Sequence, residues 1–287
     1  RRFASLCEAT GRWDTLVDFI GQVLNTSLSS EMEVFWLHRK ADCQLHQLGD
    51  TDAAFDTAQK ALVIDDTHMP SIAILEQIER MRAHWPGVDS LLVRRLEIAT
   101  DDATTLSLHT ERALLALEHL SAPLDALEYA ERASELVTDL PSQELVRVLE
   151  RLLHVETAQR RAAELLTPLY ETLQRFKGVI RTLELRQRTA DDASVDIALG
   201  LEIGRIAEEE LRDKTAALDS TLTTLRRNPA SDELRARAVS LAEETEGGLG
   251  LYITLEDTFD GIEDPSIIVD VATWLGEIYL SREAPAE

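Results

Sequence analysis

The chain has 287 residues and a formal net charge of −24, from 53 acidic and 29 basic side chains. Only 5% of its residues are aromatic and only 20 are glycine or proline (12 and 8), while 44% are apolar. This composition disfavours an all-β sandwich, which needs frequent turns and strand-forming residues, and it disfavours disorder, because there is ample apolar surface to bury. An acidic surface repels phosphate groups, so we expect no nucleic-acid partner.

Two further bulk features concern the compartment. Cys7 and Cys43 are too few for a disulfide framework, so a reducing, cytoplasmic location is the simpler expectation. The longest uncharged run covers residues 19–30 and contains polar side chains. It is too short to cross a bilayer, so we expect no membrane insertion.

Apolar residues recur with the period of an amphipathic helix along the whole chain, and no segment alternates as a strand does. In the segment before Gly49, for example, Val34, Leu37, Ala41 and Leu45 form one stripe. The pattern predicts helices over residues 11–25, 30–48, 51–64, 69–83, 86–99, 102–120, 123–136, 142–155, 157–174, 176–189, 192–211, 213–227, 231–246, 248–259 and 264–281.

The sequence also repeats itself. We take Trp13, Trp85, Phe176 and Gly248 as anchors, which lie 72, 91 and 72 residues apart, and number other positions from them. Five positions agree between copies: +3 (Leu16, Val88, Val179, Leu251), +7 (Ile20, Leu92, Leu183, Leu255), +16 (Ser29, Asp101, Asp192, Asp264), +28 (Ala41, Ala113, Gly204, Gly276) and +41 (Ala54, Ala126, Ala217). Such agreement predicts a repeat protein. The fourth copy stops before +41, and the chain does not begin with Met, so we expect a fragment of a longer chain.

Each of these positions has a physical interpretation. The aliphatic residues at +3 and +7 lie on one face of a helix. Ser or Asp at +16 is the residue type that accepts hydrogen bonds from the free N–H groups of a helix's first turn. Ala or Gly at +28 and Ala at +41 let two neighbouring helices approach closely.

One 72-residue unit therefore holds four helices, or two helix hairpins of about 36 residues, close to the 34-residue tetratricopeptide (TPR) period. The second hairpin resembles a TPR repeat in its small, turn and terminal positions, and part of the third unit does so too. The residues that carry the resemblance are Ala41, Gly49-Asp50, Ala54, Ala61-Leu62 and Asp65, then Gly204, Ala217 and Asn228-Pro229. Asp66 stands where the family has proline, and the helix before Gly49 is one residue longer than the family pattern.

The resemblance implies a right-handed α-solenoid of TPR-like hairpins, about 15–16 helices over residues 1–287 as a single domain. The 91-residue spacing leaves 19 residues more than the other two. We assign this surplus to one extra helix near 157–174, with an apolar side of Ala162-Ala163, Leu165-Leu166, Leu169 and Leu173.

Few residues suggest chemistry. The pairs Asp101-Asp102 and Asp191-Asp192 could bind metal or act as acid and base, but helix N-termini explain them better. His38, Cys43 and His46 share one helix without converging on a point. Residues 256–267 have an EF-hand-like register but end in Ile267 instead of a chelating Glu. We therefore expect no catalytic residue, no metal and no cofactor, and the binding residues stay unassigned.

Four tryptophans are the remaining candidates for contact residues. Trp13 and Trp85 share one repeat position and are expected to pack. Trp36 and Trp274 lie off that register and are better candidates for an exposed contact, although burial is the first expectation for them too.

The fold implied by the resemblance favours a non-catalytic scaffold, since TPR-like proteins mostly hold other proteins. We expect a protein or peptide partner, perhaps a basic one at the acidic segment 241–287, and a place in a larger assembly. Two alternatives are a regulatory module fused to a catalytic domain elsewhere and, less favoured, a toroidal all-helical hydrolase with paired acids in a closed pocket.

Overall fold

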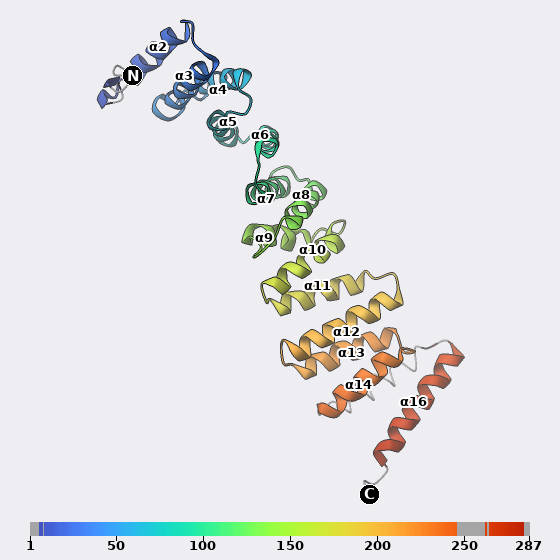
Figure 1. Ribbon diagram of the computed structural model, residues 1–287. Helices are drawn as coiled ribbons and strands as arrows, with labels where there is room; N and C mark the ends of the chain where they lie inside the picture. The colour runs from blue at the N-terminus through green and yellow to red at the C-terminus, as the bar shows by residue number, and fades with distance from the viewer. Residues whose placement is uncertain (1–5, 8, 246–261, 263, 284–287) are drawn as a thin grey trace. The chain divides into compact units, whose positions relative to one another are not determined.

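The computed structural model describes residues 6–7, 9–245, 262 and 264–283, and all regular structure in that part of the chain is helical (Figure 1). It contains 14 α-helices and one short π-helix. They belong to two compact units, Arg1–Val137 and Thr138–Glu287. The expected all-α repeat fold is thereby confirmed, while a single continuous domain over 1–287 stays a prediction.

Each helix of the first unit packs against the next one in the chain. The tightest pairs are α3 with α4 and α7 with α8, which are the two hairpins that the repeat predicts. The elements are α2 (Trp13–Leu24), α3 (Ser30–Cys43) continued by the π-helix η1 (Gln44–Leu48), α4 (Thr51–Ile64), α5 (Met69–Met81), α6 (Trp85–Ile98), α7 (Asp102–Glu118) and α8 (Pro123–Glu135).

The second unit follows the same rule from α9 to α14, and Trp274 and Leu275 of α16 pack against the core formed by α12–α14. Its elements are α9 (Gln143–Leu152), α10 (Gln159–Thr172), α11 (Phe176–Arg188), α12 (Ala193–Glu209), α13 (Lys214–Arg227), α14 (Asp232–Glu244) and α16 (Pro265–Glu283). The helix predicted over 248–259, with Gly248, Leu251 and Leu255, lies outside the described residues.

The repeat positions play their predicted parts. The side chains at +16 cap α3, α7, α12 and α16, as in the bond from the backbone N–H of Thr104 to Asp101 Oδ1 at 2.8 Å. The aliphatic residues at +3 and +7 and the alanines at +41 are buried in all three described copies. At +28, Ala41, Ala113 and Gly204 are buried, but Gly276 is exposed.

The turns repeat as exactly as the core. All six residues with positive φ in the described chain lie at two repeat positions, −2 and +36. They are Gly11, Ala83 and Gln174 at −2, then Gly49, Ser121 and Arg212 at +36, with φ between 51° and 69°. The backbone hydrogen bonds that close these turns recur as well, from 12 to 7, 84 to 79 and 175 to 170, and from 50 to 44, 122 to 116 and 213 to 207. A left-handed residue after the last turn is the usual helix C-terminus, although glycine normally occupies it.

The surplus of 19 residues falls one helix earlier than expected. The segment 157–174 is helical, as α10, but α10 ends four residues before its anchor, as α5 and α14 do before theirs. Because α10 takes the place of α5 and α14, the additional helix is α9 with its flanking turns. Tyr170 of α10 joins it to the unit by donating a hydrogen bond to Glu150 Oε1 of α9 at 2.7 Å.

The π-helix η1 explains the departure from the TPR pattern before Gly49. A π-helical turn accommodates one more residue than an α-helical turn. The additional residue is therefore absorbed inside the helix, and Gly49 still reaches the left-handed position of the turn with φ 69°.

Candidate functional site

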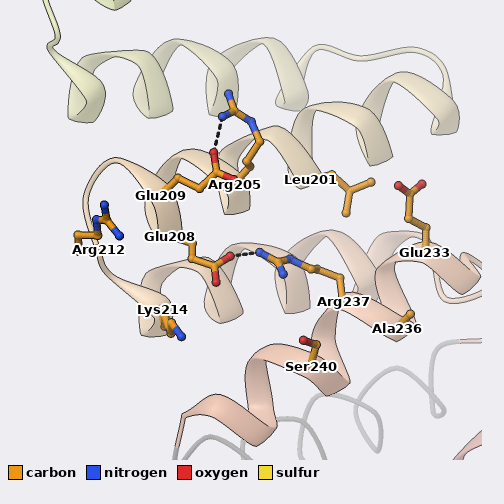
Figure 2. A pocket seen from close by; sticks show the side chains of 10 residues that line it. All are labelled: Leu201, Arg205, Glu208, Glu209, Arg212, Lys214, Glu233, Ala236, Arg237 and Ser240. Atoms are coloured by element: carbon orange, nitrogen blue, oxygen red, sulfur yellow. Dashed lines mark hydrogen bonds and ion pairs between the residues drawn. The ribbon is translucent and has the colours of Figure 1, made fainter.

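The largest hollow described on either unit is an open groove of about 1080 Å³ on the second unit, between α12 and α14 (Figure 2). Charged side chains dominate its walls, and Leu201 and Ala236 contribute apolar surface. The other lining residues are Arg205, Glu208 and Glu209 of α12, Arg212 and Lys214 at the turn into α13, and Glu233, Arg237 and Ser240 of α14. We call this set the α12–α14 groove.

The repeat explains why this wall of α12 stays open. Gly200 and Gly204 turn the opposite side of α12 toward α13, where an added Cβ on Gly200 would lie 2.2 Å from Thr224 Oγ1. That close packing leaves the polar face of α12 free. An ion pair between Arg237 and Glu208 then spans the groove from α14 to α12 (Figure 2).

Most cations of the α12–α14 groove are already neutralised. The guanidinium of Arg205 donates to Glu202 Oε1 at 2.6 Å and to Glu209 Oε2 at 2.7 Å, and the pKa of Arg205 is raised chiefly by its bond to Glu202. Lys214 pairs with Glu244, and that hydrogen bond raises the pKa of Lys214 and lowers the pKa of Glu244.

Arg212 is different from the other cations of the groove. Its side chain is exposed at one end of the groove beside Lys214, and within the described residues it has no hydrogen-bond or ion-pair partner (Figure 2). Its backbone is left-handed, with φ 57°, at the position that Gly49 holds in the first repeat. An arginine here costs conformational energy that a glycine would not.

A second hollow, of about 570 Å³, lies on the first unit over α5. Met69, Ala73 and Gln77 line it, together with a network of ionised side chains. Arg80 donates to Glu76 Oε1 at 3.0 Å and to Glu111 Oε1 at 2.5 Å, and Arg95 donates to Glu76 Oε2 at 2.8 Å. Burial, and then the charge of Glu76, raise the pKa of Glu111. The network thus ties α5, α6 and α7 together.

The structure separates the residues that the sequence had suggested for metal binding. Asp101 and Asp192 cap α7 and α12, and these bonds to backbone N–H groups lower the pKa of each carboxyl. His46 bonds to Asp42 and Gln77, the ring of His38 meets that of His68 at 5.4 Å, and Cys43 is buried against Trp13. No cluster of three metal-ligating side chains occurs in the part of the chain that the structure describes.

The tryptophans pack, as expected. Trp85 stacks on His119 with ring centroids 3.7 Å apart, and Trp13 contacts the core cluster that contains Trp36. Trp36 is buried, and Trp274 lies under the guanidinium of Arg235 at 5.3 Å. Neither off-register tryptophan is a free contact residue.

Two other expectations concern the end of the chain. Most of residues 256–267, the EF-hand-like stretch, and about half of the acidic segment 241–287 lie outside the described residues. Among the described helices, none is both long enough and apolar enough to cross a bilayer.

Sequence reasoning did not find the α12–α14 groove. Its ion pairs join residues about 30 positions apart, such as Lys214 with Glu244, and no local pattern marks them. One signal was available: Arg212 stands at the repeat position of Gly49, where glycine is the residue expected.

Comparison with known proteins adds little to this description. No protein-family model matches the chain, and no curated protein matches it. Among solved structures, the chain is similar to PilW, described as a widely conserved type IV pilus biogenesis factor, at 15% identity and a TM-score of 0.29, over 74% of this chain and 99% of that one. A likeness of this strength has no bearing on function.

Proposed function

We propose that this chain is a non-catalytic helical-repeat scaffold that binds a partner polypeptide along the α12–α14 groove. Repeat architectures leave extended surfaces free, because each repeat contacts only its neighbours. The groove has the character of such a surface: it is open, mixed in charge, and lined by two helices of successive hairpins.

The observation that carries this proposal is Arg212. An exposed arginine that has no partner among the described residues, in a conformation that favours glycine, costs stability without a structural return. At the end of a groove, its guanidinium can instead accept a carboxylate or backbone carbonyl of a bound polypeptide, with two parallel hydrogen bonds.

The non-catalytic part of the proposal rests on the groove's acidic side chains. Glu208 and Glu209 both pair with arginines, Arg237 and Arg205. A general acid or base needs a pKa set apart from that of its neighbour, with access to substrate, and paired surface carboxylates supply neither.

The test compares four forms of the full chain as bait in a native lysate, with the recovered proteins quantified by mass spectrometry. The forms are wild type, Arg212→Glu, Arg237→Glu and, as control, Arg132→Glu, which reverses an exposed charge on α8 of the first unit. We expect one set of proteins to be recovered with wild type and Arg132→Glu and to be lost with both groove variants. Equal recovery with all four forms, or no reproducible recovery, would contradict the proposal.

A further inference from the structure

Helix α16 presents an apolar stripe to solvent. Val269, Ala272, Gly276 and Leu280 follow one another at intervals of three and four residues, which places them on one helix face. Val269 is 66% exposed and Leu280 is 71% exposed, and a Cβ added to Gly276 would meet no atom within 4 Å. We call these four residues the α16 stripe.

The first repeat shows the same stripe covered. Counted from their anchors, the four positions of the α16 stripe correspond to Val34, Leu37, Ala41 and Leu45 of α3. All four are buried there. The residues that cover them belong to α4, since Ala41 and Leu45 share a core cluster with Ala54 and Ala58, and Val34 and Leu37 share one with Ala61.

The covering helix is of one kind in all three described repeats. It presents small residues at +41, +45 and +48, all of them almost completely buried. These residues are Ala54, Ala58 and Ala61 in α4, Ala126, Ala130 and Ala133 in α8, and Ala217, Thr221 and Thr224 in α13. Small residues on both sides allow the two helix axes to approach closely, with larger residues interlocking around them.

We propose that the α16 stripe is a docking site for an amphipathic α-helix with small residues at i, i+4 and i+7, supplied by a partner polypeptide. The site continues an interface that the molecule itself builds three times. The described helices with this pattern, α4, α8 and α13, bury their small residues in their own hairpins, so a second copy of the chain offers none of them. This surface differs from the α12–α14 groove and does not rest on it.

A labelled peptide with the sequence of residues 121–137, which contains the small residues of α8, is the direct probe. Fluorescence anisotropy measures its binding to the full chain and to two variants. Gly276→Leu fills the open space at the stripe, and we expect it to weaken binding by at least about tenfold, as overpacking does in a tight contact. Glu277→Leu adds the same side chain one residue away, off the stripe, and should bind as wild type does.

The remaining controls separate the proposal from its neighbours. The peptide with Ala130→Glu should lose binding, because a charge then replaces the central small residue. Arg212→Glu should bind the peptide unchanged, so that failure here and failure of the groove remain distinct. If the wild-type chain self-associates and Gly276→Leu makes it monomeric, the occupant is a second copy and the proposal is overturned.

An isolated 17-residue helix is only marginally stable, so a second measurement keeps the test decisive. The same peptide is joined to Glu287 through a flexible Gly/Ser linker, which raises its effective concentration to the millimolar range. We expect amide hydrogen exchange in α16 to slow by at least about tenfold in the tethered chain, and not when Gly276→Leu is also present. Unchanged exchange in the tethered wild-type chain would overturn the proposal.

Discussion

The two hollows of this protein use the same side chains in different ways. Over α5, two arginines and two glutamates form a partly buried network that joins three successive helices. In the α12–α14 groove, arginines and glutamates pair near solvent, and Arg212 remains without a partner among the described residues. A partly buried network is costly to break, whereas exposed pairs contribute little and stay available to a ligand. The comparison indicates a structural role for the first hollow and a binding role for the second.

The largest expected effect lies in the first hollow. Glu76→Ala removes the carboxylate that accepts from both Arg80 and Arg95, and it leaves their charges facing only Glu111. We expect the first unit to lose about 3 kcal/mol of unfolding free energy, the scale for a buried pair that loses one partner.

Urea unfolding followed by tryptophan fluorescence measures this loss, because three of the four tryptophans lie in the first unit (Trp13, Trp36 and Trp85). A loss below about 1 kcal/mol would place the network among ordinary surface ion pairs and remove the contrast between the two hollows.

The left-handed turns give effects of intermediate size. Ala83→Gly, after α5, and Arg212→Gly, after α12, each replace a strained residue, and we expect each to raise stability by about 1 kcal/mol. Ala73→Gly, in the exposed interior of α5, should lower stability by about the same amount. Thermal unfolding of the three variants is the measurement.

These two turns also separate stability from binding. If the α12–α14 groove is the binding site, Arg212→Gly gives a more stable protein that retains less partner, while Ala83→Gly gives a more stable protein that binds as before. Equal partner recovery with both variants would remove Arg212 from the site.

The pairs of the groove should contribute least to stability. Arg205→Ala removes two exposed ion pairs with Glu202 and Glu209, and we expect a change below about 1 kcal/mol. Thermal unfolding again measures it. A loss as large as that of Glu76→Ala would mean that the groove is held together as rigidly as the first hollow.

The pH dependence has opposite signs in the two units. Burial raises the pKa of Glu111, so its charged form costs stability above that raised pKa, and the cost is relieved as the pH falls toward the ordinary value of 4.5. The stability of wild type relative to Glu111→Gln should therefore increase between pH 7 and pH 5.

Asp192 behaves in the opposite way. Its capping bond to Ser194 lowers the pKa of the carboxyl, so its contribution is complete above the ordinary value of 3.8 and is lost as the pH falls below it. The difference between wild type and Asp192→Asn should be constant down to about pH 4 and should shrink at pH 3. Urea midpoints at pH 7, 5 and 3 test both residues, and parallel curves for wild type and either variant would contradict the corresponding assignment.

Much of the fold was predictable because it depends on local chemistry. The residues at +16 accept bonds from the helix immediately after them, so their type alone marks four helix starts, among them Asp101 and Asp192. The small residues at +28 and +41 are equally informative, since close helix packing admits little else. The surplus helix was misplaced by one element because α9 and α10 have similar apolar periodicity. Only the turn at Gln174, with its bond from Arg175 N–H to the Tyr170 carbonyl, aligns α10 with α5.

The candidate site depended on contacts that no local pattern encodes. Ala83, Ser121, Gln174 and Arg212 adopt a glycine-like conformation because the surrounding hairpin imposes it, and their side chains do not announce it. Ion pairs across the groove join residues of different hairpins, and the exposure of the α16 stripe depends on which helix lies against it. The amino-acid order specifies caps, periodicity and close contacts, because these act over a few residues. Packing between hairpins selects the surface that is left open, because it depends on which side chains meet across distant parts of the chain.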